Sequence, residues 1–160
     1  MISFFLLLLL APSLSLLPIS LSSSLSFQDS LGRQVFFHGV NIVQKTWPYH
    51  PFVGGFSNTD SFVEEDMQFL KDNGLNVIRL GVQWPGYQPS RSFYNSTYLD
   101  VIFSIVEKAA SYGIYTLLDF HQDVLNENFC GEGIPSWTLL PKNTSSNDEN
   151  KYLNYTFASV

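Results

Sequence analysis

The chain has 160 residues, of which 45% are hydrophobic, 16% aromatic and 14% charged, and its formal net charge is −6. This composition excludes a disordered chain, which would carry many charges and few aromatic side chains. Lysine and arginine together number only 8 and form no run, so we expect no nucleic-acid partner.

Residues 1–26 differ in composition from the rest of the chain. Residues 4–10 form an unbroken apolar run, and no charged side chain appears before Asp29. The run is shorter than the roughly 20 apolar residues that a membrane span needs. We therefore predict a secretory signal peptide over residues 1–26, cleaved near the small residues 22–26. An uncleaved membrane anchor is the alternative.

Three glycosylation sequons accompany this leader. They begin at Asn95, Asn143 and Asn154, and each has a middle residue other than proline. Leader and sequons together predict a protein of the secretory pathway, either extracellular or lysosomal. Cys130 is the only cysteine, and in an oxidising compartment a lone cysteine indicates a free thiol or a missing partner. We take it as a sign that the protein continues beyond Val160.

Three strands are expected after the leader, over residues 34–41, 77–82 and 114–119. The first and third are rich in β-branched and aromatic residues. The second is almost continuously apolar, which is typical of a parallel strand buried on both faces.

Two helices are expected between these strands. The first has Ser61 as a plausible N-cap with Glu64 as its capping-box partner, and it ends at the Asn-Gly pair 73–74. The second begins with Thr97 as cap and ends at Gly113. Residues from 141 onward show no clear period.

The alternation of strand and helix predicts a parallel α/β sheet with right-handed crossovers. A doubly wound sheet and a (β/α)8 barrel both fit this order. No glycine-rich phosphate loop follows the first strand, which disfavours nucleotide binding. A complete barrel needs ~250 residues. The order of the elements therefore predicts the α/β class and leaves both architectures open.

Polar side chains gather where the predicted strands end, which is where ligands bind in both architectures. An arginine in an otherwise apolar strand, such as Arg79, needs a charged partner because burying it alone is costly. The tryptophans could stack on a sugar ring or a lipid, or pack in the core. The polar and aromatic residues at the strand ends are His38, Asn41, Arg79, Trp84, Asp119, His121 and Asp123.

Several segments resemble known glycoside hydrolases. Residues 32–41 and 76–86 are similar to the first two strands of the cellulase-type enzymes. Residues 94–100, 117–124 and 129–135 resemble the endoglycoceramidase branch of that family in particular. In order and spacing these segments cover most of the chain after the leader, roughly residues 27 to 140.

The resemblance implies the α/β class and a (β/α)8 TIM barrel, of which residues 27–160 form the N-terminal part, about the first three to four β/α units. It also implies an enzyme that releases oligosaccharide from the ceramide of glycosphingolipids, with retention of configuration. Such chemistry uses two carboxyl groups about 5 Å apart. In the family both are glutamates, at the ends of the fourth and seventh strands, so we expect them beyond Val160 and expect the 160-residue chain to be inactive alone. Glu127 and Glu132 are interpreted as loop acids without a catalytic role.

The resemblance also implies roles for individual residues. Arg79 would support the nucleophilic carboxylate, with a structural ion pair as the alternative. Lys45, His121 and Asp123 would bind the sugar; a core histidine, a loop carboxylate and a solvated lysine are the alternatives. Further candidates for supporting or stacking roles are His38, Asn41, Trp84, Asp119 and Trp137.

Partners and rival functions complete the prediction. We expect a glycosphingolipid substrate, a lipid or micelle surface and no cofactor, and oligomeric state is not predicted. No metal site is predicted, because the three histidines lack paired ligand spacing and there is no cysteine pair. One rival is a non-catalytic secreted module that binds glycan or lipid. The other is a β-glucanase of the same barrel family, which residues 121–123 and 130–135 disfavour.

Overall fold

The computed structural model describes residues 16–139 and contains a three-stranded parallel sheet. The strands are β3 (Gly39–Ile42), β4 (Val77–Val82) and β5 (Tyr115–Phe120), in the order β3-β4-β5. β4 has the predicted bounds, and β5 is shifted by one residue from the prediction. The alternating β/α order therefore produces the parallel sheet that was expected from it.

The first strand is shorter than predicted, because residues 34–38 are used differently. Gln34 forms an isolated antiparallel bridge with Gln28. The Asn76 side chain donates to the carbonyl of Phe36 and accepts from the backbone N–H of His38, at 2.8 and 2.9 Å. These contacts hold the segment as a connection into β3, so its predicted strand character is wrong.

The N-cap of helix α1 (Glu64–Asp72) lies two residues after the predicted cap, Ser61. Its N-cap is Val63, whose backbone N–H donates to the carboxylate of Asp66 at 2.9 Å. Asp66 therefore plays at Val63 the capping role that Glu64 was expected to play at Ser61. The Ser61 hydroxyl donates to the preceding loop instead.

Helix α3 (Ser96–Ser111) also begins earlier than predicted. Asn95 is its N-cap and accepts from the backbone N–H of Tyr98 at 3.2 Å, so the cap assigned to Thr97 is wrong. The end is as predicted: Gly113 has φ +81°, a conformation that glycine adopts without steric cost. Short helical turns follow the strands, α2 at Trp84–Tyr87, η1 at Glu127–Phe129 and η2 at Ser136–Thr138.

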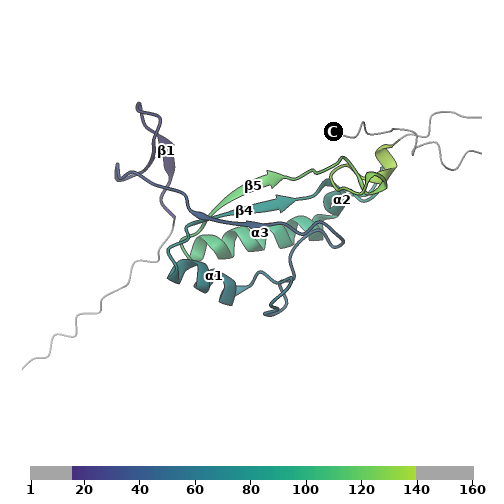
Figure 1. Cartoon of the computed structure of the whole chain (residues 1–160), viewed down its shortest axis with the longest axis horizontal. Helices are drawn as coiled ribbons and strands as arrows, with labels where there is room; N and C mark the ends of the chain where they lie inside the picture. Colours follow the sequence, from purple (N-terminus) through teal and green to yellow (C-terminus); the bar gives the residue numbers. More distant parts are fainter. Residues whose placement is uncertain (1–15, 140–160) are drawn as a thin grey trace, which may run out of the picture.

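The core lies between the sheet and the two longer helices, which cover one face of it (Figure 1). Full burial of such a side chain contributes roughly 1.5–3 kcal/mol, so this layer accounts for much of the stability of the described chain. No helix in residues 16–139 is long and apolar enough to cross a membrane. The buried apolar side chains of the layer are Phe62, Met67, Leu70, Ile78, Leu80, Tyr98, Ile102, Ile105, Ala109 and Ile114.

The opposite face of the sheet carries Val77, Arg79 and Leu117, which line an open hollow of about 560 Å³. No helix among residues 16–139 covers this face, and Leu117 is 59% exposed. In a closed barrel this face would form the interior, filled by side chains from the other strands.

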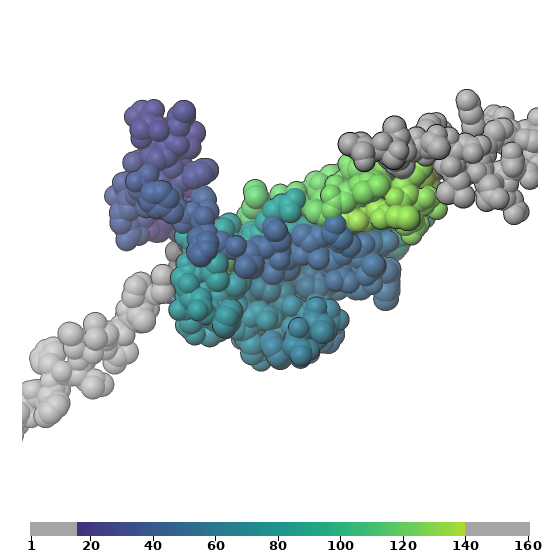
Figure 2. Space-filling model, in the orientation of Figure 1, coloured from purple at the N-terminus to yellow at the C-terminus, as the bar shows by residue number. Residues whose placement is uncertain are grey.

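An antiparallel hairpin, not foreseen from the sequence, precedes the sheet. Strand β1 (Ile19–Leu21) pairs with β2 (Phe27–Asp29). The hairpin projects from one end of the molecule, and the segment after β5 lies at the other end (Figure 2). β1 falls within the predicted leader, residues 1–26.

Candidate functional site

A chain of ionic contacts begins in the sheet and runs to its carboxyl edge. Asp119 of β5 accepts from Nδ1 of His121 and pairs with a guanidinium nitrogen of Arg79, each at 2.7 Å. His121 directly follows the strand, and its backbone N–H continues the ladder to the carbonyl of Val82 at 3.0 Å. The pairing supplies the charged partner that Arg79 was expected to need.

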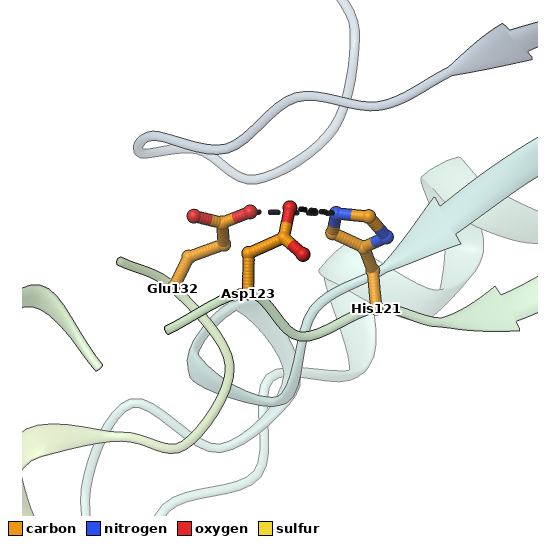
Figure 3. Close-up of side chains that lie close together, drawn as sticks. All are labelled: His121, Asp123 and Glu132. Carbon is orange, nitrogen blue, oxygen red and sulfur yellow. Dashed lines mark ion pairs between the residues drawn. The ribbon is translucent and has the colours of Figure 1, made fainter. Parts of the chain in front are cut away.

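The contacts continue through the other side of the His121 ring. Its Nε2 lies 3.4 Å from a carboxylate oxygen of Asp123 and 3.3 Å from Oε1 of Glu132. Nζ of Lys45, in the loop after β3, lies 2.8 Å from the same Oε1 and also contacts Asp123. Figure 3 shows the two carboxylates and the imidazole side by side. We call this set the polar cluster: Lys45, Arg79, Asp119, His121, Asp123 and Glu132.

Two members of the polar cluster, His121 and Glu132, are buried. Their side chains are 9% and 10% exposed. Oε1 of Glu132 is paired with the Lys45 ammonium at 2.8 Å, whereas Nε2 of His121 makes no hydrogen bond of normal geometry within the part of the chain that the structure describes. A buried polar atom without a hydrogen bond is costly, so His121 Nε2 is suited to a polar ligand.

The charges of Lys45 and Asp123 reinforce each other. The hydrogen bond to Asp123, and then that to Glu132, raises the pKa of Lys45 above its usual 10.5. The same hydrogen bond from Lys45 lowers the pKa of Asp123 below 3.8. Both groups are therefore charged throughout the physiological pH range.

His121, Asp123 and Glu132 also form a geometric candidate for a metal site, since their donor atoms lie within 4.8 Å of one another. Imidazole and carboxylate are usual ligands of divalent ions. The grouping exists only in the fold, so ligand spacing along the sequence could not reveal it. Here the ammonium of Lys45 already contacts both carboxylates. We therefore assign the role of their positively charged partner to Lys45 and not to a metal ion.

Glu132 reaches the polar cluster because its loop folds back on itself. The backbones of Asp123 and Glu132 exchange two N–H···O bonds of 2.8 Å. Gly131 makes the close approach possible, since a Cβ there would lie 2.2 Å from the Asp123 carbonyl oxygen. Sequence reasoning interpreted Glu132 as a solvated loop acid. The flanking glycines were the one signal of a tight fold.

Asn126 anchors the interior of this loop. Its side chain is buried, donates to the carbonyl of Ile134 at 2.7 Å and accepts from the backbone N–H of Asn128 at 2.8 Å. Val124 and Leu125 have φ of +50° and +69°, values that are strained for residues other than glycine. Such strain persists where the surrounding contacts fix the backbone, commonly at functional sites.

Aromatic residues flank the polar cluster. The ring of Trp84 packs edge to face against that of Trp137, with 6.0 Å between the ring centroids, and lies 6.5 Å from the ring centroid of Phe120. Trp47 is 82% exposed, and with Lys45 and Glu132 it lines a hollow of about 280 Å³. The hollow thus combines an exposed indole, a half-exposed ammonium and a buried carboxylate.

Other predicted site residues lie elsewhere. His38 precedes β3 and sits at the amino edge of the sheet, away from the polar cluster, because the strand begins only at Gly39. Asn41 is paired in register with Arg79 and lines the hollow on the open face. Of the sequons, Asn95 is the α3 cap, while Asn143 and Asn154 lie outside the described residues.

Comparison with protein families gives one match: a model described as cellulase (glycosyl hydrolase family 5) fits residues 39–159. The chain is 58% identical over 118 residues to the endoglycoceramidase of Cyanea nozakii, covering 74% of this chain and 23% of that protein. It is 58% identical over 111 residues to the endoglycoceramidase of Hydra vulgaris, covering 69% and 21%. The chain thus spans less than a quarter of the length of these relatives.

A solved structure of endo-glycoceramidase II from Rhodococcus sp., described as its lactosyl-enzyme intermediate, is also similar. Its TM-score is 0.57 at 25% identity, with 71% of this chain and 26% of that chain covered. Together with the observed parallel β/α units, these matches confirm the predicted resemblance and the predicted barrel class.

Proposed function

The chain belongs to glycosyl hydrolase family 5, the cellulase family, and we propose that it forms the sugar-binding part of an endoglycoceramidase. Such an enzyme hydrolyses the bond between the oligosaccharide and the ceramide of a glycosphingolipid. The 58% identity to the endoglycoceramidase of Cyanea nozakii carries the proposal. The family match over residues 39–159 spans the whole polar cluster.

The proposed sugar contacts come from Lys45, His121, Asp123 and Glu132. A sugar hydroxyl both donates and accepts, so it can bridge an ammonium and a carboxylate. A hydrogen bond to a charged group contributes about 1.5–3 kcal/mol, more than one between neutral groups. The buried Nε2 of His121, which makes no hydrogen bond of normal geometry among the described residues, favours a hydroxyl at this point.

Arg79 has a second proposed task beside its pairing with Asp119. A guanidinium carries five N–H donors in a rigid fork, and one nitrogen contacts Asp119 in the described structure. We propose that the remaining donors face the nucleophilic carboxylate, in line with the role implied by the family resemblance. Asp119 then fixes Arg79 and His121 together.

Retention of configuration is part of the proposal. The similar Rhodococcus structure is described as a lactosyl-enzyme intermediate, and a covalent glycosyl-enzyme forms in retaining enzymes. Two glutamates outside the 160 residues would supply the acid/base and the nucleophile. The residues of this chain would bind and orient the sugar against them.

A lipid surface and secretion are proposed on other grounds. Trp47, Val124 and Leu125 are exposed near the polar cluster, where they could contact ceramide or a micelle. Tryptophan suits such a boundary because one end is apolar and the other polar. The apolar leader and the three sequons support a secreted or lysosomal protein.

The test is the incubation of the protein, at its natural length, with lactosylceramide in detergent micelles. Chromatography and mass spectrometry of the products should find intact lactose and free ceramide. Stepwise release of single sugars, or cleavage of cello-oligosaccharides in preference to the lipid, would contradict the proposal. Saturable binding to lactosylceramide vesicles without any release would favour the non-catalytic alternative.

A further inference from the structure

The predicted cleavage region, residues 22–26, forms the turn of the folded hairpin. Ser22 accepts from Leu25 N–H and donates its own N–H to the Ser26 carbonyl, both at 2.9 Å. The Ser22 and Ser26 hydroxyls lie 2.7 Å apart. β1 before the turn pairs with β2 over three residue pairs. Residues on both sides of the predicted cut thus belong to one structural unit.

The hairpin is attached to the sheet through both of its arms. The Tyr115 hydroxyl donates to the carbonyl of Leu17 at 2.8 Å. Phe37 stands edge to face between Phe27 of β2 and Tyr115, at ring distances of 5.1 and 5.4 Å. Ile19 lines the hollow beneath the open face of the sheet. Leu17 and Ile19 are therefore in contact with the sheet, although both lie within the predicted leader.

Cleavage within residues 22–26 would remove these contacts. β2 would lose its partner strand, and an unpaired edge favours aggregation. The Tyr115 hydroxyl would lose its acceptor, and Phe27 would lose the cover of the first arm. A leader peptidase cuts before the domain folds, so the cut decides whether the hairpin can form at all.

The sequence offers an earlier cleavage site. A signal peptide requires an apolar stretch of 7–15 residues followed by a small-x-small pattern. Residues 4–10 supply the stretch, and Ser13-Leu14-Ser15 supplies the pattern two residues before Leu17, whose carbonyl accepts from Tyr115 of the sheet. A leader of 15 residues is at the short end of the usual range of roughly 15–30.

We propose that the leader is cleaved between Ser15 and Leu16, so that the hairpin remains part of the mature domain. Water adds across this peptide bond, giving a new carboxylate on Ser15 and a new amino terminus on Leu16. The inference rests on the proposed secretory leader but not on the proposed hydrolase activity. It replaces the expected cut near residues 22–26 by one that spares β1.

The test is secretion of the protein from a eukaryotic host at its natural length. After enzymatic deglycosylation, N-terminal sequencing and intact mass should place the first residue at Leu16. A first residue at Ser23 or later would overturn the proposal, because β1 would be absent from the mature protein. Retention of Met1 in the secreted protein would overturn it as well. Lactosylceramide hydrolysis by the same sample reports separately on the proposed function.

Two matched substitutions sharpen this test. Ser15→Trp places a bulky side chain directly before the proposed bond, where a small one is required. It should abolish the Leu16 terminus and reduce secretion at least several-fold. Ser24→Trp changes an exposed turn residue and should leave the terminus at Leu16. The reverse pattern, in which only Ser24→Trp alters processing, would contradict the proposal.

Discussion

At the scale of single residues, sequence reasoning identified most members of the polar cluster and missed Glu132. His121 and Asp123 were singled out because they follow a predicted strand, where barrel ligands bind. The family resemblance implied their sugar-binding role and added Lys45. Glu132 lies nine residues after Asp123 in a loop with positive φ at Val124 and Leu125. No sequence pattern predicts such φ values for these residue types. The folding back of the loop, which brings Glu132 next to Asp123, therefore could not be predicted.

Glu132 is the residue whose proposed role is easiest to test. Glu132→Gln keeps the size of the side chain but removes the charge that contacts Lys45. The proposed hydrogen bond between the sugar and the charged Glu132 contributes about 1.5–3 kcal/mol. Its loss should lower kcat/KM for lactosylceramide roughly 10- to 100-fold. The control is Glu127→Gln, at an exposed loop carboxylate, which should retain activity within about twofold. Equal effects of the two substitutions would refute the assignment.

The ionic contact between Lys45 and Asp123 makes a prediction about pH. Because the pKa of Asp123 is lowered in the fold, its contribution to stability is present above about pH 3.8 and is lost as the pH falls through the lowered value. Because the pKa of Lys45 is raised, that contribution is fully present below about pH 10.5 and lost only as the pH rises through the raised value. Neither Lys45 nor Asp123 should therefore change its charge between pH 5 and 9, and this pair should cause no change in sugar affinity over that range.

The measurement is an NMR titration of Asp123 with ¹³C-labelled aspartate, in the unmodified protein and in Lys45→Met. The substitution removes the hydrogen bond that is the largest cause of the shift, so the pKa of Asp123 should rise toward its usual value. Lys108→Met, which removes a distant surface ion pair with Glu64, is the control and should leave that pKa in place. An unchanged pKa in Lys45→Met would show that the contact does not exist in solution.

At the scale of elements, the strands and helices were predicted best where hydrophobic periodicity decides them. Both ends of β4 were predicted correctly, because a short, continuous apolar run is typical of a strand that is buried on both faces. Helix starts were misplaced by two residues, because Asn95 and Asp66 act as capping groups where nearby hydroxyl residues also fit the pattern. The hairpin was missed because its first arm was interpreted as leader.

The loop that carries Glu132 depends on the side chain of Asn126. Removal of that side chain should therefore affect sugar binding indirectly, through the position of the loop. Asn126→Ala leaves the Ile134 carbonyl and the Asn128 N–H without their partner, and should lower the free energy of unfolding by about 1–3 kcal/mol. It should also weaken sugar binding, because Glu132 loses its position. Chemical denaturation and kcat/KM measure the two effects. Asn128→Ala, at an exposed position, should change neither, and a similar loss there would contradict this account of the loop.

The hairpin makes a second prediction at this scale. Tyr115→Phe removes only the hydroxyl that binds the Leu17 carbonyl and should lower the free energy of unfolding by about 0.5–1.5 kcal/mol. The control is Tyr94→Phe, since Tyr94 is exposed. If thermal or denaturant unfolding shows no difference between the two variants, the hairpin is not attached to the sheet in the way described.

At the scale of the whole molecule, the β/α alternation predicted a parallel α/β sheet and left two architectures open. The family resemblance implied the barrel, and the family match confirms it. The same scale limits what these residues do alone. The chain spans less than a quarter of the length of its curated relatives, and one face of its sheet is uncovered within residues 16–139. We propose that the binding groups of this chain act together with catalytic carboxylates from another part of the enzyme.

The most direct test of the central proposal is ¹H NMR of the first sugar formed from lactosylceramide by the protein at its natural length. One spectrum reports both the bond that is cut and the stereochemistry of the cut. The proposal predicts intact lactose that appears first as the β-anomer and then mutarotates. Free galactose as the first product, or lactose that appears first as the α-anomer, would contradict it.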